Sequence, residues 1–161
     1  MMRRRVKRAR AGGFDLRIPP DERDLLRSVG PQLRNLLERE AASAQQGEDT
    51  AVSRLFPVAY PTDDDRQTEY RLLVHDELLA SHLGALAVLE ATADADHVDE
   101  DQLATWMRAL NHVRLVLGTR LEVTEEGDER PISPRDPRAS AFAVYDYLTY
   151  LQGEIVEALS G

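Results

Sequence analysis

Three of the four histidines occupy positions where their imidazole groups could act together. His75 and His82 are seven residues apart, which is two helical turns and one helix face, and His112 lies in another apolar segment. Imidazole is both a metal ligand and a general base, so convergence of the three would create a candidate metal site. No HExxH pattern and no carboxylate at matching spacing accompanies them. The sequence therefore favours hydrogen-bonded histidines within a leucine-rich arc, with no metal and no cofactor, and leaves open whether the three converge.

The other residues that could carry chemistry do not form an enzymatic pattern. The chain has no cysteine, which excludes a disulfide framework, a thiolate zinc site and a cysteine nucleophile. No GxSxG, GxxxxGK(S/T) or GxGxxG motif occurs. The carboxylates from Asp94 to Asp101 lack the central glycine and the spaced glutamate of a calcium loop, so we expect a helix-capping loop there. We predict a non-enzymatic protein with no catalytic residue.

Basic residues gather near residue 1 of an otherwise acidic chain. Six of the 20 cationic residues form this basic arm: Arg3, Arg4, Arg5, Lys7, Arg8 and Arg10. Residues 11–161 then carry 14 cationic and 29 acidic side chains, a formal net charge of −15. A surface of that sign repels nucleic-acid phosphates and anionic membranes, so only the arm could attract DNA.

The last apolar segment carries two tyrosines beside acidic residues. On a helical projection Tyr147 and Tyr150 fall away from the Val144–Leu148–Leu151–Ile155 stripe and among Asp146 and Glu154. Tyrosine combines a large contact area with a polar tip, which makes these residues candidate anchors for a protein partner. The alternative is that both tyrosines cover another part of the same fold, such as an N-terminal hairpin or a long loop.

The elements that must position these residues begin with a β-hairpin. Gly12-Gly13 is typical of a two-residue hairpin loop, and the flanking residues alternate with period two. This loop would pair Ala11 with Phe14 and Arg10 with Asp15. One face of the hairpin would then pack on a core: Ala9, Ala11, Phe14, Leu16 and Ile18.

Helical spacing of apolar residues follows. Pro19-Pro20 predicts the start of a helix, and Gly30-Pro31 predicts a break in it, an outline that also resembles a helix-turn-helix. A long connecting loop, 45–64, would be anchored by Leu55, Phe56 and Tyr60. The longest helix should run from about residue 65 to 93.

Two further helices complete the expected bundle. Asp99, with Gln102 three residues later, predicts a capping box at the start of a helix. The apolar spacing continues across Gly118, so this glycine should lie inside that helix and pack closely against an aromatic side chain of the last helix. An acidic loop, 123–135, would precede a final helix that starts at Asp136-Pro137.

Length and composition predict one domain, residues 1–161. A chain of 161 residues that is 42% hydrophobic can bury one core. We therefore expect a mainly α fold, a single-domain bundle of about four to five helices with an N-terminal β-hairpin. The basic start is not followed by the apolar stretch of a signal peptide, so we expect a cytoplasmic protein without a membrane segment.

Several stretches resemble an actinobacterial family of unknown function. "LVLGTRLEVTEE" (115–126) and "VYDYLTYLQGEIVEAL" (144–159) are similar to that family, as are "GGFDLRI", "LLRSVGPQLRNLL" and "RLFPVAYP". Genes of this family commonly neighbour the gene of the ClpS adaptor. The resemblance implies a regulatory or adaptor-type interaction protein, linked to the ClpS and Clp protease pathway, with a ClpS-type adaptor as partner. The alternative remains a DNA-binding transcriptional regulator that uses the basic arm.

Overall fold

Four long helices and a small antiparallel sheet make up the described part of the chain. The computed structural model describes residues 4–42, 50–56, 65–123 and 133–161. Its elements, in chain order, are β1 (Val6–Arg8), β2 (Phe14–Leu16), α1 (Pro20–Ala42), α2 (Thr50–Ser53), α3 (Asp65–Thr92), β3 (His97–Val98), α4 (Glu100–Arg120) and α5 (Ala139–Ser160). The expectation of a mainly α fold with four to five helices and an N-terminal hairpin is confirmed.

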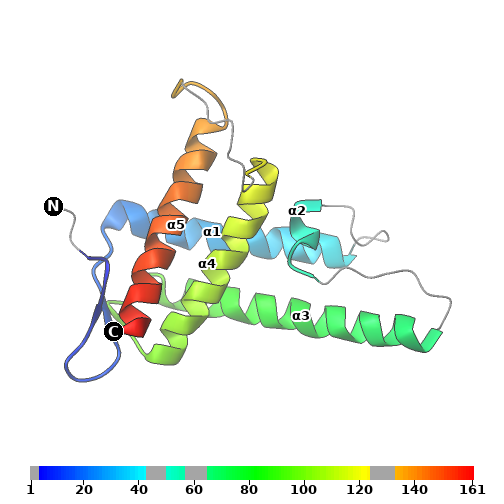
Figure 1. Ribbon diagram of the computed structural model, residues 1–161, viewed down its shortest axis with the longest axis horizontal. Helices are drawn as coiled ribbons and strands as arrows, with labels where there is room; N and C mark the ends of the chain where they lie inside the picture. Colours follow the sequence, from blue (N-terminus) through cyan, green and yellow to red (C-terminus); the bar gives the residue numbers. More distant parts are fainter. Residues whose placement is uncertain (1–3, 43–49, 57–64, 124–132) are drawn as a thin grey trace.

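The helices are arranged as two antiparallel pairs (Figure 1). Helices α4 and α5 run antiparallel and in contact, and α1 and α3 form a second antiparallel pair that crosses them. The sheet lies at the end of the molecule where α5 finishes, since β1 contacts α5. Residues near both ends of the chain are therefore neighbours.

The hairpin register differs from the prediction. Strands β1 and β2 pair Val6 with Leu16 and Arg8 with Phe14, so Arg10 does not lie opposite Asp15, whose partner is Lys7. The connection is longer than two residues because the chain turns through Ala9–Gly13, with both Gly12 and Gly13 at positive φ. As a result Val6, rather than the small Ala9 or Ala11, is buried beside Phe14 and Leu16.

A third strand completes the sheet at a segment predicted to be a loop. β3 pairs antiparallel with β2, joining Phe14 to Val98 and Asp15 to His97. Two residues are too short to give a periodic pattern, so the sequence carries no strand signal there. The strand leaves Val98 buried against the core.

Helix α1 is continuous, so the predicted break at Gly30-Pro31 is wrong. Pro31 lies inside the helix, on its exposed side, where a proline removes only its own backbone hydrogen bond. Gly30 faces α3, and a Cβ atom at this position would lie 3.0 Å from Cγ of Glu90. Because α1 is unbroken, this segment does not form a helix-turn-helix.

Helix α3 is buried over its C-terminal half and exposed near its start. Leu86 and Leu89 are fully buried, whereas Tyr70, Leu72 and Leu73 are at least half exposed where the helix extends past α4 and α5 (Figure 1). The segment Leu72–Thr92 is long and apolar enough to cross a membrane, properties that core helices of globular proteins share. Leu55 and Phe56, which follow α2, pack beside this helix as predicted, and Tyr60 lies outside the described residues.

Both local predictions for α4 are confirmed. Asp99 accepts a hydrogen bond from the backbone of Gln102, whose side chain accepts one from the backbone of Asp99 in return. Gly118 is buried inside the helix, where a Cβ atom would lie 3.0 Å from Cε2 of Tyr145 on α5. A side chain at this position would require the Tyr145 ring to shift.

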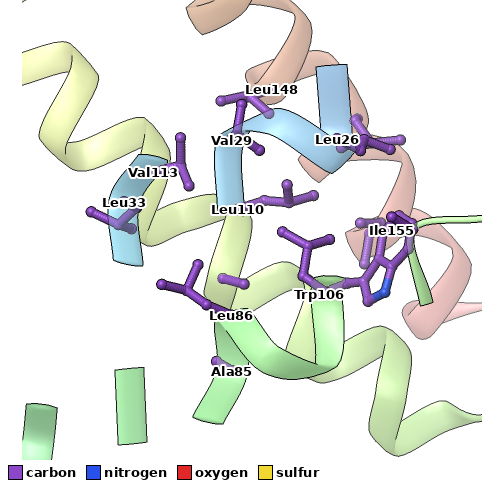
Figure 2. Close-up of a cluster of buried hydrophobic side chains, with 14 of the residues drawn as sticks. Leu26, Val29, Leu33, Ala85, Leu86, Trp106, Leu110, Val113, Leu148 and Ile155 are labelled. Carbon is purple, nitrogen blue, oxygen red and sulfur yellow. The ribbon is translucent and has the colours of Figure 1, made fainter. Parts of the chain in front are cut away.

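The core lies where the two helix pairs cross. Figure 2 shows buried side chains from α1, α3, α4 and α5 in one cluster, with Leu110 of α4 inside it. Trp106 is fully buried in this cluster, and its indole nitrogen donates a 2.6 Å hydrogen bond to Thr92 at the end of α3. The largest buried side chain therefore has its polar atom satisfied.

Candidate functional site

Three of the four predicted partner-binding residues meet the basic arm at one junction. The guanidinium of Arg5 donates to both carboxylate oxygens of Glu22 on α1, at 3.0 and 2.8 Å. The backbone nitrogen of Arg5 donates to Glu154 on α5 at 2.9 Å. Tyr147 and Tyr150 lie beside these carboxylates on α5. We call these five residues the arm junction.

The arm junction is an electrostatic network. Hydrogen bonding to Arg5 holds the pKa of Glu22 below its ordinary value, and the same contact raises the pKa of Arg5. The hydroxyl of Tyr147 is buried near Glu22, although the geometry does not meet the criteria for a hydrogen bond. Burial is the main cause that raises the pKa of Tyr147, and the nearby Glu22 carboxylate is the second. Hydrogen bonding to Glu154 raises the pKa of Tyr150. The Glu22 carboxylate therefore stays ionised and the two phenols stay neutral at neutral pH.

The four predicted anchors divide into two pairs. Tyr147 packs against the hydrophobic core, and Glu154 is half-buried under the N-terminal segment. Asp146 is exposed, and Tyr150 lies half-buried at the edge of the junction. Asp146 and Tyr150 lie at the surface of the fold, whereas Tyr147 and Glu154 are oriented towards α1 and the N-terminal segment.

Several cations of the basic arm contact the fold. Besides Arg5, Arg4 lies 3.4 Å from Glu157, and Arg8 donates to the carbonyl of Ala158 and stacks over the Phe14 ring. Lys7 and Arg10 are exposed, and Arg3 lies outside the described residues. The arm is therefore folded onto α5 rather than extended, which reduces the positive charge that it offers to DNA.

His82 and His112 are in direct contact, whereas His75 is joined to them only through the ring of Phe56. The His75 ring stacks on Phe56 with centroids 4.1 Å apart, Phe56 meets His82 edge-on at 5.4 Å, and the His82 and His112 centroids are 4.2 Å apart. The Nε2 atom of His82 lies 2.8 Å from the carbonyl of Leu55, which ties the end of α2 to α3. The sequence could not predict these contacts, because they depend on the packing of α3 against α4 and on the position of Phe56 beside α3.

His112 is neutral near pH 7, and each histidine of the cluster has one unsatisfied ring nitrogen. Burial, with smaller contributions from His82 and Arg108, lowers the pKa of His112 to about 4. The Nδ1 atoms of His75, His82 and His112 are buried without a hydrogen-bond partner in the described structure. Among the described residues, no group of three or more histidine or acidic side chains has a geometry that could hold a metal ion. The cluster therefore resembles a packed aromatic core more than a metal centre.

Arg23 connects several elements of the fold, and no sequence pattern predicted this role. Arg23 of α1 is mostly buried and donates to the backbone carbonyls of Leu16, Ile18, Ala93 and Ala95 and to the Asp96 carboxylate. It thereby joins β2, α1 and the segment that leads from α3 to β3. No spacing rule distinguishes this arginine from its exposed neighbour Arg27, because its partners are carbonyls distant in sequence.

The fold and its arm junction define a mainly helical domain in which an N-terminal sheet is fastened to the last helix. The chain belongs to the family described as Domain of unknown function (DUF2017), which matches residues 2–159. The predicted resemblance to a family of unknown function is confirmed at this level. No solved structure matches the chain significantly.

Mycobacterial proteins with a named role are similar to the chain. The Oxidative stress regulator AosR of Mycobacterium tuberculosis (strain ATCC 25618 / H37Rv) is 30% identical over 158 residues, which covers 88% of this chain and 72% of that protein. The protein of the same name from Mycobacterium bovis has the same identity and coverage. A Mycobacterium leprae protein that bears this name provisionally is 30% identical over 189 aligned positions, covering 97% of this chain and 87% of that protein.

Proposed function

We propose that this chain is a non-enzymatic regulatory protein of the cytoplasm that acts in the response to oxidative stress by binding another protein. The relatives named as oxidative stress regulators support the pathway, and the arm junction with the exposed surface beside it supports the mode of action. A ClpS-type adaptor is the partner to test first, because of the gene neighbourhood of the family that the sequence resembles.

The main structural support for this proposal is a row of surface residues on the outer face of α5. Residues at spacings of three and four are exposed or half-buried along the helix: Asp146, Thr149, Tyr150, Gly153, Val156 and Glu157. Val156 is 47% exposed, and a Cβ atom at Gly153 would meet nothing within 4 Å. We call this set the α5 stripe. It combines apolar contact area with carboxylates, so it suits a partner surface that is apolar with basic residues around it.

The absence of cysteine limits how such a regulator could work. Oxidants are commonly sensed by a thiolate that is converted to a sulfenic acid or a disulfide. These 161 residues contain no cysteine, so they cannot supply that chemistry themselves. This supports a role in which the chain transmits or assembles a response through a partner.

The experiment is a calorimetric titration with the ClpS-type adaptor from the same organism, at near-physiological salt. We expect saturable binding that Tyr150→Ala weakens at least about tenfold, the loss typical of an interface anchor. Tyr70→Ala is the matched control, because Tyr70 is 68% exposed on α3, away from the α5 stripe. Tyr147→Ala is unsuitable, since its ring packs against the core.

Two results would contradict this proposal. Absence of heat together with failure to co-elute would exclude the adaptor as a direct partner. DNA binding that falls steeply with salt and is lost in Lys7→Gln/Arg10→Gln would favour the DNA-binding alternative. Substituting these two exposed cations is a better test than deleting the arm, because deletion would also remove the contact between Arg5 and Glu22.

A further inference from the structure

The outer face of α3 is apolar and exposed along most of the helix. One line of residues, at alternating spacings of three and four, has a single charged member, Glu77. The other members are apolar, and all of them are exposed: Tyr70, Leu73, Ala80, Gly84, Ala87 and Ala91. We call this line the α3 face, and it is about 32 Å long at the rise of an α-helix. The solvent side of a surface helix is normally polar, so an apolar line of this length is typical of a contact surface.

Side-chain size is unevenly distributed along the α3 face. Its first two members are large, and Tyr70 is 68% and Leu73 62% exposed. Its last three members are small: Gly84, Ala87 and Ala91. A Cβ atom at Gly84 would meet nothing within 4 Å. Small residues let a neighbouring helix approach closely, whereas large apolar residues need a depression to fill. The two halves of the face therefore complement each other in shape, although they cannot meet within one helix.

Two copies of the α3 face fit together when their helices run antiparallel. A twofold axis beside Ala80 places Tyr70 of one copy opposite Ala91 of the other, and Leu73 opposite Ala87. Each large side chain then meets a small one, twice, as a twofold interface requires. A parallel arrangement would instead place large residues against large ones and small residues against small ones.

Charges along one border of the face favour the same arrangement. Arg34 of α1 borders the C-terminal half of α3, where its guanidinium donates to Glu90 at 3.0 Å and to the carbonyl of Leu83 at 3.4 Å. Its side chain stays 29% exposed. On a helical projection the exposed Glu69 and Asp76 lie on this same border, in the N-terminal half. Antiparallel pairing brings these carboxylates of one copy beside Arg34 of the other.

We propose that two copies of this chain associate through the α3 face as an antiparallel twofold pair. Glu77 of each copy lies opposite Gly84 of the other, where the missing side chain leaves room for the carboxylate to reach the solvent. The contact of one helix pair is small, so the dimer is weak, with a dissociation constant in the micromolar range. The inference goes beyond the proposed function and does not depend on it, because the α3 face and the α5 stripe belong to different helices.

The first test is sedimentation equilibrium of the full chain over a range of concentrations, where we expect a reversible dimer. Gly84→Glu should weaken it at least about tenfold, because a side chain there holds the helices apart. Gly153→Glu on α5 is the matched control, since a Cβ atom has open space at both glycines and both variants should fold. A monomer at all concentrations up to about 1 mM, or equal dimerisation of the two variants, would overturn the proposal.

The second test determines the direction of the helices. The chain has no cysteine, so each introduced thiol is unique. Ala80→Cys should cross-link with its own counterpart under a mild oxidant, because Cα atoms about 4.4–6.8 Å apart can be bridged. Ala91→Cys should not cross-link with itself, since the two copies are about 30 Å apart in this arrangement, but it should cross-link with Tyr70→Cys in an equimolar mixture. Cross-linking of Ala91→Cys with itself alone would show parallel helices and overturn the assignment.

Charge and lipid controls complete the test. Asp76→Arg places a cation beside Arg34 of the other copy and should weaken the dimer about threefold to fivefold, whereas Asp101→Arg, exposed on α4, should leave it unchanged. Equal affinity of Asp76→Arg and the wild type would contradict the proposed pairing of charges. Co-sedimentation with phosphatidylcholine vesicles, without a dimer in solution, would identify a lipid surface as the occupant of the α3 face and would equally overturn the proposal.

Discussion

The guanidinium of Arg5 and the carboxylate of Glu22 form a two-point pair that joins the segment before β1 to α1, with nitrogen–oxygen distances of 3.0 and 2.8 Å. Both side chains are mostly buried, at 14% and 16% exposure. The pair differs in this from Arg4 and Glu157, which are 3.4 Å apart and about two-thirds exposed. Partly buried bidentate pairs contribute to stability, whereas exposed single contacts contribute little.

Replacing Glu22 should therefore destabilise the chain more than replacing Glu157. We expect Glu22→Gln to lower the free energy of unfolding by about 1.5–3 kcal/mol, because it removes a charged partner of a mostly buried guanidinium. Glu157→Gln, the control, should change it by less than about 1 kcal/mol. Urea denaturation followed by circular dichroism measures both. Equal effects of the two variants would show that burial does not strengthen the contact.

The same pair predicts part of the acid sensitivity. The pKa of Glu22 is lowered in the folded chain, so its contribution is complete above the ordinary value of 4.5 and is lost as the pH falls through the folded pKa. Denaturation curves recorded at a series of pH values should therefore show a smaller loss of stability in acid for Glu22→Gln than for the wild type. An unchanged pH dependence would assign the acid sensitivity to other carboxylates.

Even a conservative replacement of Arg23 should lower the stability of the chain. Arg23→Lys keeps the charge but cannot reach the carbonyls of Ile18, Ala93 and Ala95 together, because an ammonium lacks the planar fork. We expect a loss of at least about 2 kcal/mol, from carbonyls left without a donor in a half-buried site. Arg27→Lys, whose partners Asp24 and Asp94 are exposed carboxylates, should cost less than about 1 kcal/mol.

Gly118 and Gly153 should respond oppositely to an added side chain. Gly118→Val places atoms against Tyr145 and should destabilise the chain by about 1–3 kcal/mol through overpacking. Gly153→Ala, in open space on α5, should stabilise it by up to about 1 kcal/mol, because alanine is the better helix former. Thermal unfolding measures both. A stable Gly118→Val variant would mean that Tyr145 can move away without loss.

His112 should make the chain less stable in mild acid. Its pKa is lowered from 6.5 to about 4, so the unfolded chain binds the proton more tightly than the folded one. Stability is complete above pH 6.5 and decreases as the pH falls towards 4, by about 3 kcal/mol in total. His112→Asn should flatten this part of the curve between pH 7.5 and 5. Identical slopes in variant and wild type would show that His112 titrates normally.

Local rules predicted the features that depend on neighbours in sequence. Asp99 and Gln102 are three residues apart, and their reciprocal hydrogen bonds need no other part of the chain. The glycine at position 118 interrupts neither the apolar spacing nor the helix, so its place inside α4 followed from the residues around it. The capping box and the continuous helix were predictable because the information lies within one or two turns, whereas the contact between Gly118 and Tyr145 joins two helices.

Other predictions were wrong or stayed open where the structure depends on contacts between segments that are distant in sequence. The turn Ala9–Gly13 is longer than expected because Val6 offers a larger apolar side chain to the core than Ala9 does, which moves the register. Pro31 did not break α1, since packing along α3 outweighs one lost backbone hydrogen bond. Two of the predicted partner anchors, Tyr147 and Tyr150, have different surroundings: Tyr147 packs against the core and Tyr150 lies at the edge of the arm junction. This difference depends on how α5 is rotated against the N-terminal segment, which no local sequence pattern specifies.

Trp106 gives the chain a built-in optical probe. It is the only tryptophan, it is fully buried where the helix pairs cross, and its ring nitrogen is bound to Thr92. Its fluorescence should be blue-shifted while the core is intact and should shift to longer wavelength when water enters. One unlabelled emission signal can therefore report on the core in all the variants above, and its kinetics would show whether α3 and α4 separate in one step.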